Sequence, residues 1–198
     1  AAITATGFAV STSARQASRI RQVARYCIAG APTSAVNRAE KAERDIPALL
    51  AHRERYGSLK DASGDFERMT GKEFIAQTCD VLVPCAVANT LHSNNAELVE
   101  AKLIVEGAHG PTSVRADRIL EGRGIPVVPD ILANGGGVTV SHAEWVQGRQ
   151  GIDWDEEEVT DYLEQKISDA AENVREVMQE CDTDMRTAAY AVALRRLC

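Results

Sequence analysis

The sequence lacks the patterns that mark several common classes of protein. Its five cysteines are odd in number and form no CxxC pair, which argues against a disulfide framework and against a zinc site, and fits a reducing cytoplasm. No apolar run reaches the roughly 20 residues of a membrane span. The net charge is −7 and the basic residues are spread along the chain, so neither a nucleic-acid surface nor a polybasic membrane anchor is expected. A small molecule is the expected partner.

The beginning of the chain also lacks a targeting signal. The first ten residues, AAITATGFAV, contain neither an initiator Met nor a basic segment, so they do not indicate a signal peptide and are more typical of a chain cut at its beginning. With 198 residues, 44% of them hydrophobic, the chain is long enough to bury a substantial core. We therefore expect a globular domain.

Short apolar segments alternate with helical patterns along the first two thirds of the chain. The apolar segments are mostly too short for helices and are followed by Gly, Pro or polar residues. The strands expected from them cover residues 3–8, 25–29, 80–84, 103–106 and 125–129. Helices are expected over residues 14–24 and 114–120, after the N-cap Asp45 with its first-turn Pro47, and after the capping box of Thr70 and Glu73. The alternation predicts an α/β fold, a mostly parallel sheet with helices on both faces.

The last third of the chain is predicted to be helical. Asp153 and Glu156 can cap a long helix whose apolar residues recur every three or four positions. These residues are Val159, Leu163, Ile167, Ala170, Val174 and Val177. A second helix is expected over residues 185–197. There is no internal repeat or low-complexity linker, so we expect one domain, residues 1–198, which helices complete from about residue 153.

Three segments of the sequence resemble the cofactor-binding half of glutamate dehydrogenases. They are VEGAHGPTSVRAD (residues 105–117), GIPVVPDILANGGGVTVSHAEWVQ (residues 124–147) and DMRTAAYAVAL (residues 184–194). Upstream, DVLVPCAVANTL (residues 80–91) resembles the strand and turn of that family that face the nicotinamide ribose. The resemblance is close to continuous from about residue 45 to the end, and it implies a Rossmann-like, doubly wound sheet that binds NAD or NADP.

The start of the chain departs from this family. In the family the first strand ends in a glycine fingerprint that receives the cofactor's pyrophosphate, and GFAVST stands at that place here. The resemblance assigns Gly7, Phe8, Ala9 and Val10 to cofactor binding. Ala9 and Thr12 replace the second and third glycines, however, and a side chain at these positions would crowd the pyrophosphate and the packing of helix on strand.

Two explanations of this departure stay open. The acidic residue that would hold a ribose hydroxyl is also missing, with Thr33 or Ser34 nearest its place, so the sequence does not choose between NAD and NADP. Either residues 1–44 are frameshifted or misread, or the chain has diverged into a domain that no longer binds a dinucleotide.

The triple glycine at residues 135–137 has a physical explanation within this resemblance. A bound nicotinamide lies flat against backbone at the carboxyl ends of the strands, where a Cβ would obstruct it. The resemblance assigns Asn134 and Gly135 to the cofactor, and it assigns Val138 and Ser141 to the pocket for the substrate's side-chain carboxylate. In the alternative interpretation, the glycines form a flexible loop and Ser141 caps a helix.

Further cofactor contacts are implied in the two upstream segments. The resemblance assigns Ala86 and Asn89 to the cofactor, together with His109, which replaces the usual Asn and can still donate a hydrogen bond. Cys85 follows Pro84 near the same place, where an ordinary buried thiol is the simpler interpretation.

The remaining histidines and arginines are interpreted as structural. His142 replaces a usual aromatic residue, and His52, His92 and His142 are taken as surface or packing residues. Four arginines of the first expected helix are taken as a solvated face: Arg15, Arg19, Arg21 and Arg25. The sequence offers no metal cluster, P-loop or pair of nucleophile and base, so no catalytic residue is assigned.

The resemblance implies the reversible oxidative deamination of L-glutamate to 2-oxoglutarate and ammonia. The family's acid–base lysine and aspartate belong to a preceding substrate domain that we do not find in this chain, so the chain alone is expected to be inactive. It is expected to act within a homo-oligomer, a hexamer by resemblance. Two alternatives are a degenerate, non-catalytic module and a relative acting on branched-chain or aromatic amino acids.

Overall fold

The computed structural model describes residues 26–29, 51–57 and 69–198. Its described residues fall into two compact units. The first lies within Ile20–Val127, and we call it the sheet unit. The second covers Val128–Cys198, and we call it the helical unit.

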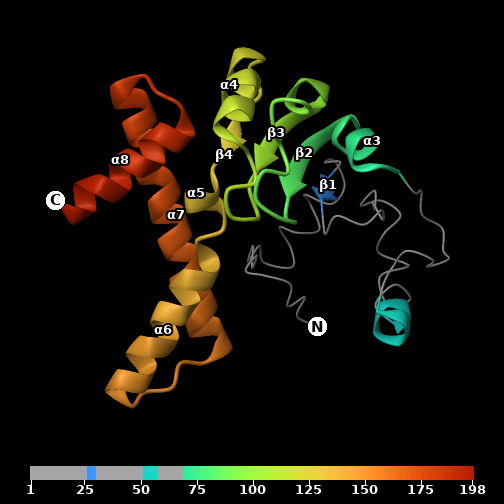
Figure 1. Ribbon diagram of the computed structural model, residues 1–198. Coiled ribbons are helices and arrows are strands. Elements are labelled where there is room, and N and C mark those ends of the chain that lie inside the picture. Colours follow the sequence, from blue (N-terminus) through green and yellow to red (C-terminus); the bar gives the residue numbers. More distant parts are fainter. Residues whose placement is uncertain (1–25, 30–50, 58–68) are drawn as a thin grey trace. The chain divides into compact units, whose positions relative to one another are not determined.

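The strands form one sheet in the order β1-β2-β3-β4 (Figure 1). They are β1 (Tyr26–Ala29), β2 (Cys79–Pro84), β3 (Ala101–Val105) and β4 (Val127–Val128). The pairs β1–β2 and β2–β3 are both parallel. Parallel neighbours need crossover connections, which helices usually supply, and helices do follow β2, β3 and β4 along the chain. The predicted α/β class is confirmed.

Strand β4 is shorter than the predicted strand at residues 125–129. Pro126 and Pro129 flank its two residues, and proline has no N–H to donate to a sheet ladder. The carbonyl of Pro126 still accepts a hydrogen bond of 3.0 Å from Ile104 N, which joins β3 to the start of β4. Strand β3 begins two residues earlier than predicted and ends before the buried Glu106.

Three short helical elements cover the core of the sheet unit. Helix α3 (Gly71–Ile75) begins with the predicted capping box, in which Thr70 Oγ1 accepts from Glu73 N and Thr70 N donates to the Glu73 carboxylate. This second hydrogen bond holds the pKa of Glu73 below its ordinary value. Helix α4 (Val114–Gly122) confirms the prediction for residues 114–120, whereas the 3-10 turn η1 (Ala96–Leu98) was not predicted.

The core of the sheet unit joins these helices to the two central strands. Leu82 of β2 and Ile104 of β3 are almost completely buried and pack in one cluster with residues of all three helical elements. The helical members are Phe74, Ile75, Ala96, Ala116 and Leu120. Burial of this apolar surface fixes the strands and, with them, the loops that follow each strand.

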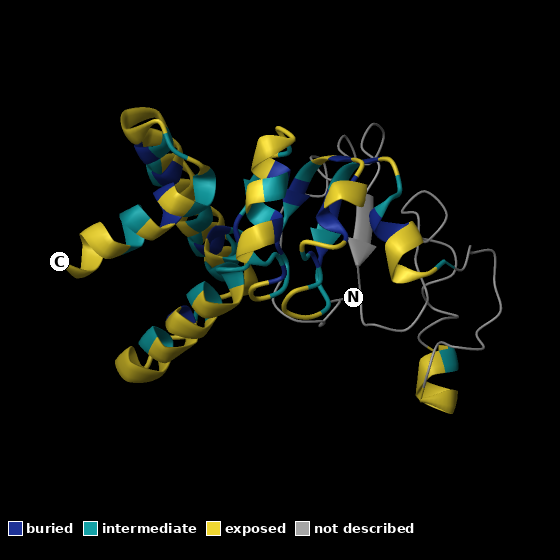
Figure 2. Ribbon diagram, turned by 45° about the horizontal axis from the view of Figure 1, so that its top comes forward, coloured by how far each residue is buried: buried dark blue, intermediate teal, exposed yellow. Residues whose placement is uncertain are grey.

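The helical unit is built around one long helix, α7 (Glu156–Cys181). It contacts α5 (Asp130–Ala133), α6 (Gly136–Gln150) and α8 (Met185–Leu197) (Figure 1). The predicted helix over residues 185–197 is confirmed. Figure 2 shows buried and exposed residues alternating along α7 and α8. The burial along α7 matches the predicted apolar spacing. Leu163, Val174 and Val177 are buried, and Val159, Ile167 and Ala170 are partly buried.

The cap of α7 differs from the prediction. Asp155, and not Asp153 or Glu156, is the N-cap, because its carboxylate accepts a hydrogen bond of 2.9 Å from Glu158 N while Asp155 N donates to Glu158 Oε2 at 2.9 Å. This is a second reciprocal capping box. The acidic first turn also suits the positive end of the helix dipole.

Several predicted elements lie outside the described residues. These are the strand at residues 3–8, the helix at residues 14–24, and the helix start at Asp45 and Pro47. Residues 51–56, which follow that expected start, are helical.

Candidate functional site

The loops that follow β2 and β3 lie at one edge of the sheet and carry candidate cofactor-binding residues, so we call this the candidate edge of the sheet unit. Ala86 and Asn89 come directly after β2, and His109 comes shortly after β3. Since β2 and β3 are parallel neighbours, their carboxyl ends meet at one edge of the sheet. The structure therefore brings these three predicted residues to the same edge.

Backbone hydrogen bonds join the two loops to each other. Asn89 N donates to the Gly110 carbonyl and Leu91 N donates to the Pro111 carbonyl, both at 2.8 Å. Ser113 N returns a hydrogen bond of 2.9 Å to the Leu91 carbonyl. Because these bonds use the main chain, they need no side-chain donor or acceptor. Main-chain hydrogen bonds therefore fix the backbone of Asn89 close to the loop that carries His109.

Two residues of these loops adopt left-handed backbone conformations. Asn89 has a φ of 56° and Gly110 a φ of 55°. Asparagine and glycine tolerate this region better than other residues do. Each turn directs the chain back toward the other loop at the place where Asn89 N meets the Gly110 carbonyl.

Gly107 and Cys85 pack closely below the exposed part of this edge. A Cβ built on Gly107 would overlap the Cys85 sulfur, so the position requires glycine as long as Cys85 keeps its place. Gly107 N and Ala108 N both donate to the Pro84 carbonyl, at 3.1 and 2.9 Å. Burial raises the pKa of the Cys85 thiol, which favours its neutral form and agrees with the interpretation of Cys85 as a packing thiol.

The side chains at the edge are open to solvent. Asn89 and His109 are exposed, Ala86 is partly buried, and Val87 between them is 54% exposed. An amide and an imidazole can donate and accept hydrogen bonds, and the neighbouring Val87 offers apolar surface. This combination suits a flat polar ring such as a carboxamide-bearing heterocycle.

In the helical unit, the triple glycine starts a helix and is not a flexible loop. Asn134 is the C-cap of α5, Gly135 is the N-cap of α6, and Gly136 and Gly137 open the first turn of α6. A Cβ on Gly135 would meet its nearest atom at 3.6 Å, and so would a Cβ on Gly136. These are ordinary contacts, and neither glycine has a positive φ. Neither packing nor backbone conformation requires glycine at these two positions.

Val138 and Ser141 lie three residues apart on α6 and therefore share one face of the helix. Both are exposed, Val138 to 72%. Ser141 lies within the helix and does not cap it, so the alternative interpretation of its role is wrong. The face combines an apolar group with a hydroxyl donor.

Sequence reasoning missed one contact beside this face. Tyr162 of α7 lies with its hydroxyl 3.3 Å from Nδ1 of His142, which directly follows Ser141. We interpreted His142 as a surface or packing residue. The two residues are 20 positions apart, and no local sequence pattern connects them.

Four predicted cofactor-binding residues lie outside the described part of the chain. They are Gly7, Phe8, Ala9 and Val10, and the replaced position Thr12 lies there too. Their assignment stays a prediction.

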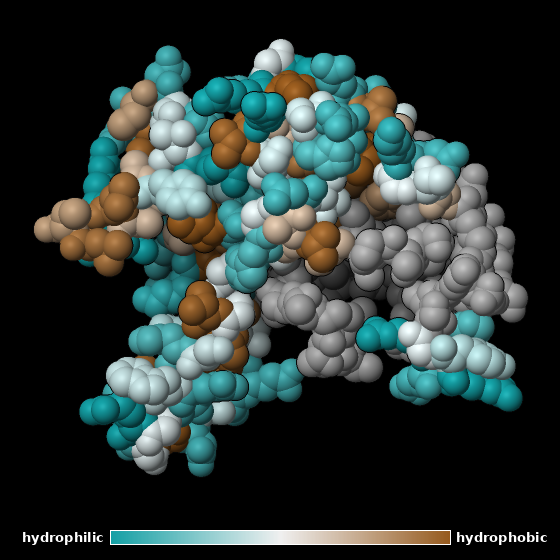
Figure 3. Space-filling view, in the orientation of Figure 1, coloured by the Kyte–Doolittle hydropathy of each residue, from teal (hydrophilic) through white to brown (hydrophobic). Residues whose placement is uncertain are grey.

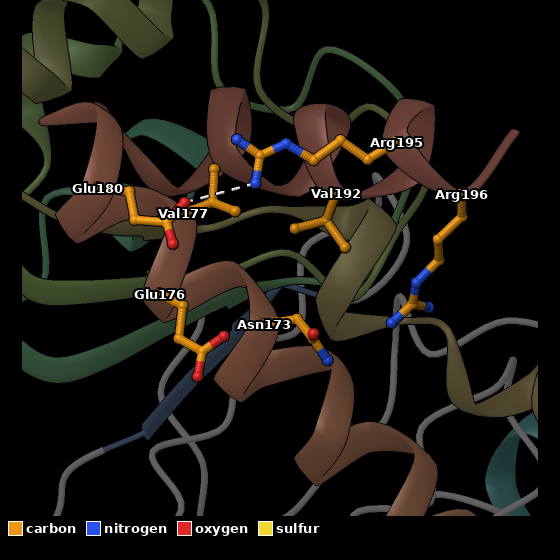
Figure 4. Close-up of a pocket in the computed structure, with 7 residues that line it drawn as sticks. All are labelled: Asn173, Glu176, Val177, Glu180, Val192, Arg195 and Arg196. Carbon is orange, nitrogen blue, oxygen red and sulfur yellow. Dashed lines mark hydrogen bonds and ion pairs between the residues drawn. The ribbon is translucent and has the colours of Figure 1, made fainter. Parts of the chain in front are cut away.

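A small pocket of the helical unit contains none of the predicted site residues. It has a volume of about 160 Å³ and lies between α7 and α8 (Figure 4). Arg195 and Arg196 line it together with Glu176 and Glu180, and the one pair joined in the view is Arg195 with Glu180, at 3.5 Å. The lining thus contains two positive and two negative charges.

Among the described residues, no group of three or more His, Cys, Asp or Glu residues is arranged to hold a metal ion. No helix in this part of the chain combines the length and the apolar character needed to cross a membrane.

The parallel sheet, the candidate residues after its strands and the following helices together define a Rossmann-like α/β domain. The solved structures agree. The chain superimposes with a TM-score of 0.69 on a hetero-hexameric glutamate dehydrogenase from Thermus thermophilus, at 33% sequence identity, over 77% of this chain and 36% of that one.

The model of the Glutamate/Leucine/Phenylalanine/Valine dehydrogenase family matches residues 5–198, and the chain belongs to this family. Two curated relatives illustrate the similarity. An NADP-specific glutamate dehydrogenase of Synechocystis sp. is 44% identical over 161 residues, 77% of this chain and 38% of the relative. An NAD-specific glutamate dehydrogenase of Staphylococcus aureus is 43% identical over 152 residues, 77% of this chain and 36% of the relative. The chain thus spans little more than a third of the length of these relatives.

Proposed function

We propose that this chain is the cofactor-binding domain of a glutamate dehydrogenase. It works with NAD or NADP in the reversible oxidative deamination of L-glutamate to 2-oxoglutarate and ammonia. Family membership supports the reaction class. The relatives named NADP-specific and NAD-specific support both cofactors equally.

The observation that carries the proposal is the bare first turn of α6. Glycine costs roughly 0.5–1 kcal/mol relative to alanine within a helix, yet Gly135 and Gly136 have room for a Cβ and ordinary φ values. Since the fold does not require glycine there, the close approach of a ligand explains it. A nicotinamide ring is such a ligand, because it needs backbone without side chains beside it.

The donor groups of the described residues fit a nicotinamide dinucleotide. In the sheet unit, Asn89 and His109 would hold the nicotinamide end at the edge after β2 and β3, with Ala86 leaving room for the ribose. By resemblance, Asn134 and Gly135 of the helical unit are also cofactor contacts, and Gly7, Phe8, Ala9 and Val10 are the contacts expected for the pyrophosphate. The cofactor, when bound, supplies the hydride acceptor or donor, and the protein supplies orientation and electrostatics.

The α6 face suits a substrate with a side-chain carboxylate. The Ser141 hydroxyl can donate a hydrogen bond to a carboxylate oxygen, and Val138 can cover the substrate's methylene groups. A leucine, phenylalanine or valine side chain would leave the Ser141 hydroxyl without a partner, and sites that hydrogen-bond their substrate discriminate strongly against analogues that lack the group. This favours glutamate among the substrates in the family's name.

The chain is expected to need a substrate domain for activity. The family's acid–base lysine and aspartate belong, by resemblance, to a preceding domain, so we assign all 198 residues to the dinucleotide-binding domain and no catalytic residue to it. We also propose a homo-oligomer, a hexamer by resemblance, acting in the cytoplasm. The hetero-hexameric relative supports assembly into an oligomer.

A second function has a specific observation in its favour. Ala9 and Thr12 replace two glycines of the pyrophosphate turn, and a chain that no longer binds dinucleotide could serve assembly or regulation as a degenerate module.

An activity assay separates the two functions. The chain joined to its substrate domain is expected to form NADH or NADPH in the presence of L-glutamate, whereas the 198-residue chain alone is expected to form none. A Ser141→Ala variant of the joined protein should lose about 10- to 150-fold in kcat/KM for glutamate, the usual effect of losing a hydrogen bond to a charged group. A folded, joined protein without activity would favour the degenerate module.

A further inference from the structure

Helix α6, which carries Val138 and Ser141, takes its position from α7. Ala143 of α6 and Leu163 of α7 are both buried, and a Cβ on Gly136 would lie 3.6 Å from Leu163 Cδ1. This packing places one face of α6 against α7. Polar contacts, which are directional, add a further constraint on the rotation of α6 about its own axis.

Two hydrogen bonds that involve side chains of α6 connect it to the chain that follows. The Tyr162 hydroxyl of α7 lies 3.3 Å from His142 Nδ1. Near the end of α6, Gln147 Oε1 accepts a hydrogen bond of 2.7 Å from Trp154 N. The two bonds hold α6 at positions about one and a half turns apart, since a turn takes 3.6 residues.

The Tyr162 side chain is itself held in place. Its ring centroid lies 5.3 Å from that of Trp154, and Lys166 Nζ lies 5.4 Å from the Tyr162 ring centroid. The His142 ring lies 5.9 Å from the Trp145 ring. A hydroxyl on a ring that is fixed in this way is a better anchor than one on a freely rotating side chain, because less rotamer entropy is lost when the hydrogen bond forms.

We propose that His142 and Tyr162 are a positioning pair that fixes the rotation of α6 and so directs Ser141 and Val138 at the substrate's side-chain carboxylate. The inference rests on the substrate-binding role proposed above. Ser141 and His142 are consecutive, so their side chains point about 100° apart around the helix. Fixing His142 against α7 thereby fixes the direction of Ser141. By resemblance the family usually has an aromatic residue in place of His142, which makes the pair a feature of this chain.

Steady-state kinetics of the chain joined to its substrate domain test the pair. Tyr162→Phe keeps the ring and removes the hydroxyl, and we expect it to raise KM for L-glutamate about 3- to 10-fold, the effect of one lost hydrogen bond, with kcat changed less than about twofold. His142→Ala should have the same effect, and the double variant no larger one, because both changes break one contact. His142→Gln, which keeps a hydrogen-bonding group, should recover most of the parent KM.

The matched control is Tyr190→Phe on α8, which removes the hydroxyl of an exposed tyrosine. It should leave KM and kcat unchanged. Equal effects of Tyr190→Phe and Tyr162→Phe, or additive effects of His142→Ala and Tyr162→Phe, would overturn the pair.

Amide hydrogen exchange separates this inference from the proposed function. In the 198-residue chain, Tyr162→Phe should speed exchange in α6 about 3- to 10-fold and leave β2 and β3 unchanged. Unchanged exchange in α6 overturns the positioning pair, and so does faster exchange with an unaltered KM. If the parent joined protein is inactive, the proposed function fails, and the exchange result alone decides whether the pair holds α6.

Discussion

In the sheet unit, the loops that carry Asn89 and His109 are joined through the main chain, whereas in the helical unit Val138 and Ser141 lie on a helix held mainly through side chains. The Asn89–Gly110 and Leu91–Pro111 bonds join main-chain groups of the two loops. The pose of α6 depends on particular residues such as Tyr162. The difference implies that the backbone determines the spacing of the candidate residues in the sheet unit, whereas particular side chains hold the helix that carries the candidate substrate residues in the helical unit.

Apolar side chains are also exposed at the end of the last helix of the helical unit. Leu194 and Leu197 of α8 are exposed, Leu197 to 82%, and hydrophobic residues gather there in Figure 3. Exposed leucines are common on single chains, and nothing in the described residues identifies what covers these.

The largest difference between the units is expected from truncation of the sheet core. Ile104→Ala removes a fully buried side chain from the cluster that fixes β3, and should lower the free energy of unfolding by about 3 kcal/mol. The contrasting change in the helical unit, Val138→Ala, removes an exposed side chain of α6 and should cost less than about 0.5 kcal/mol. Urea unfolding followed by circular dichroism compares them, and similar losses would break the distinction.

A smaller loss is expected at the close contact below the candidate edge. Gly107→Ala places a methyl group against the Cys85 sulfur and should destabilise the chain by about 1–3 kcal/mol. Adding Cys85→Ala makes room, so the double variant should unfold at a higher urea concentration than Gly107→Ala alone. A Gly107→Ala chain as stable as the parent would show that the loops are not held as tightly as described.

The cap of α8 tests a side-chain contact in the helical unit. Burial alone would raise the pKa of Asp184, but hydrogen bonds from the Thr187 hydroxyl and from backbone N–H groups outweigh it and lower the pKa below 3.8. The folded chain therefore binds fewer acid protons than the unfolded chain, so this stabilisation is present above about pH 4 and is lost as pH falls through the lowered pKa.

Two substitutions of Asp184 separate the effect of its charge on stability from the effect of its capping hydrogen bond. Asp184→Ala should lower the free energy of unfolding by about 1 kcal/mol at pH 7. Asp184→Asn keeps a cap acceptor, so it should keep most of that stability and weaken the loss in acid. Urea midpoints between about pH 6 and pH 3 measure both effects, and an Asn variant with the parent's full acid slope would contradict this account of the cap.

The smallest stability effect is expected in the first turn of α6. Gly136→Ala improves helix propensity and meets Leu163 at an ordinary distance, so it should leave stability unchanged or raise it by about 0.5 kcal/mol. It should also leave NADH affinity unchanged, because the methyl group faces Leu163 of α7. Thermal unfolding and NADH titration of the same variant give both values, and a less stable variant would show that α6 and α7 pack more tightly at this position than described.

The sequence predicted local structure well where one short segment decides it. The Thr70 capping box, the strand at β2 and the apolar spacing of α7 were all predictable, since each depends on residues close in the chain. The N-cap at Asp155 was misplaced by two residues because Asp153 and Asp155 are chemically equivalent caps, and only the reciprocal bond with Glu158 distinguishes them.

Contacts between distant residues could not be predicted in the same way. The resemblance selected Asn89 and His109, but not the hydrogen bond between Asn89 N and the Gly110 carbonyl that brings the two loops together. The His142–Tyr162 contact spans two helices and had no sequence signal at all. The glycines at residues 135–137 were recognised as meaningful, while their place at the start of a helix became clear from the structure.

The central claim, that this chain binds a nicotinamide dinucleotide, is tested most directly by fluorescence titration of the 198-residue chain with NADH and, separately, with NADPH. We predict saturable binding of one of them, abolished by Gly135→Val in a chain whose circular dichroism matches that of the parent. No saturable binding of either cofactor by the folded parent chain, or equal binding by Gly135→Val, would contradict the claim.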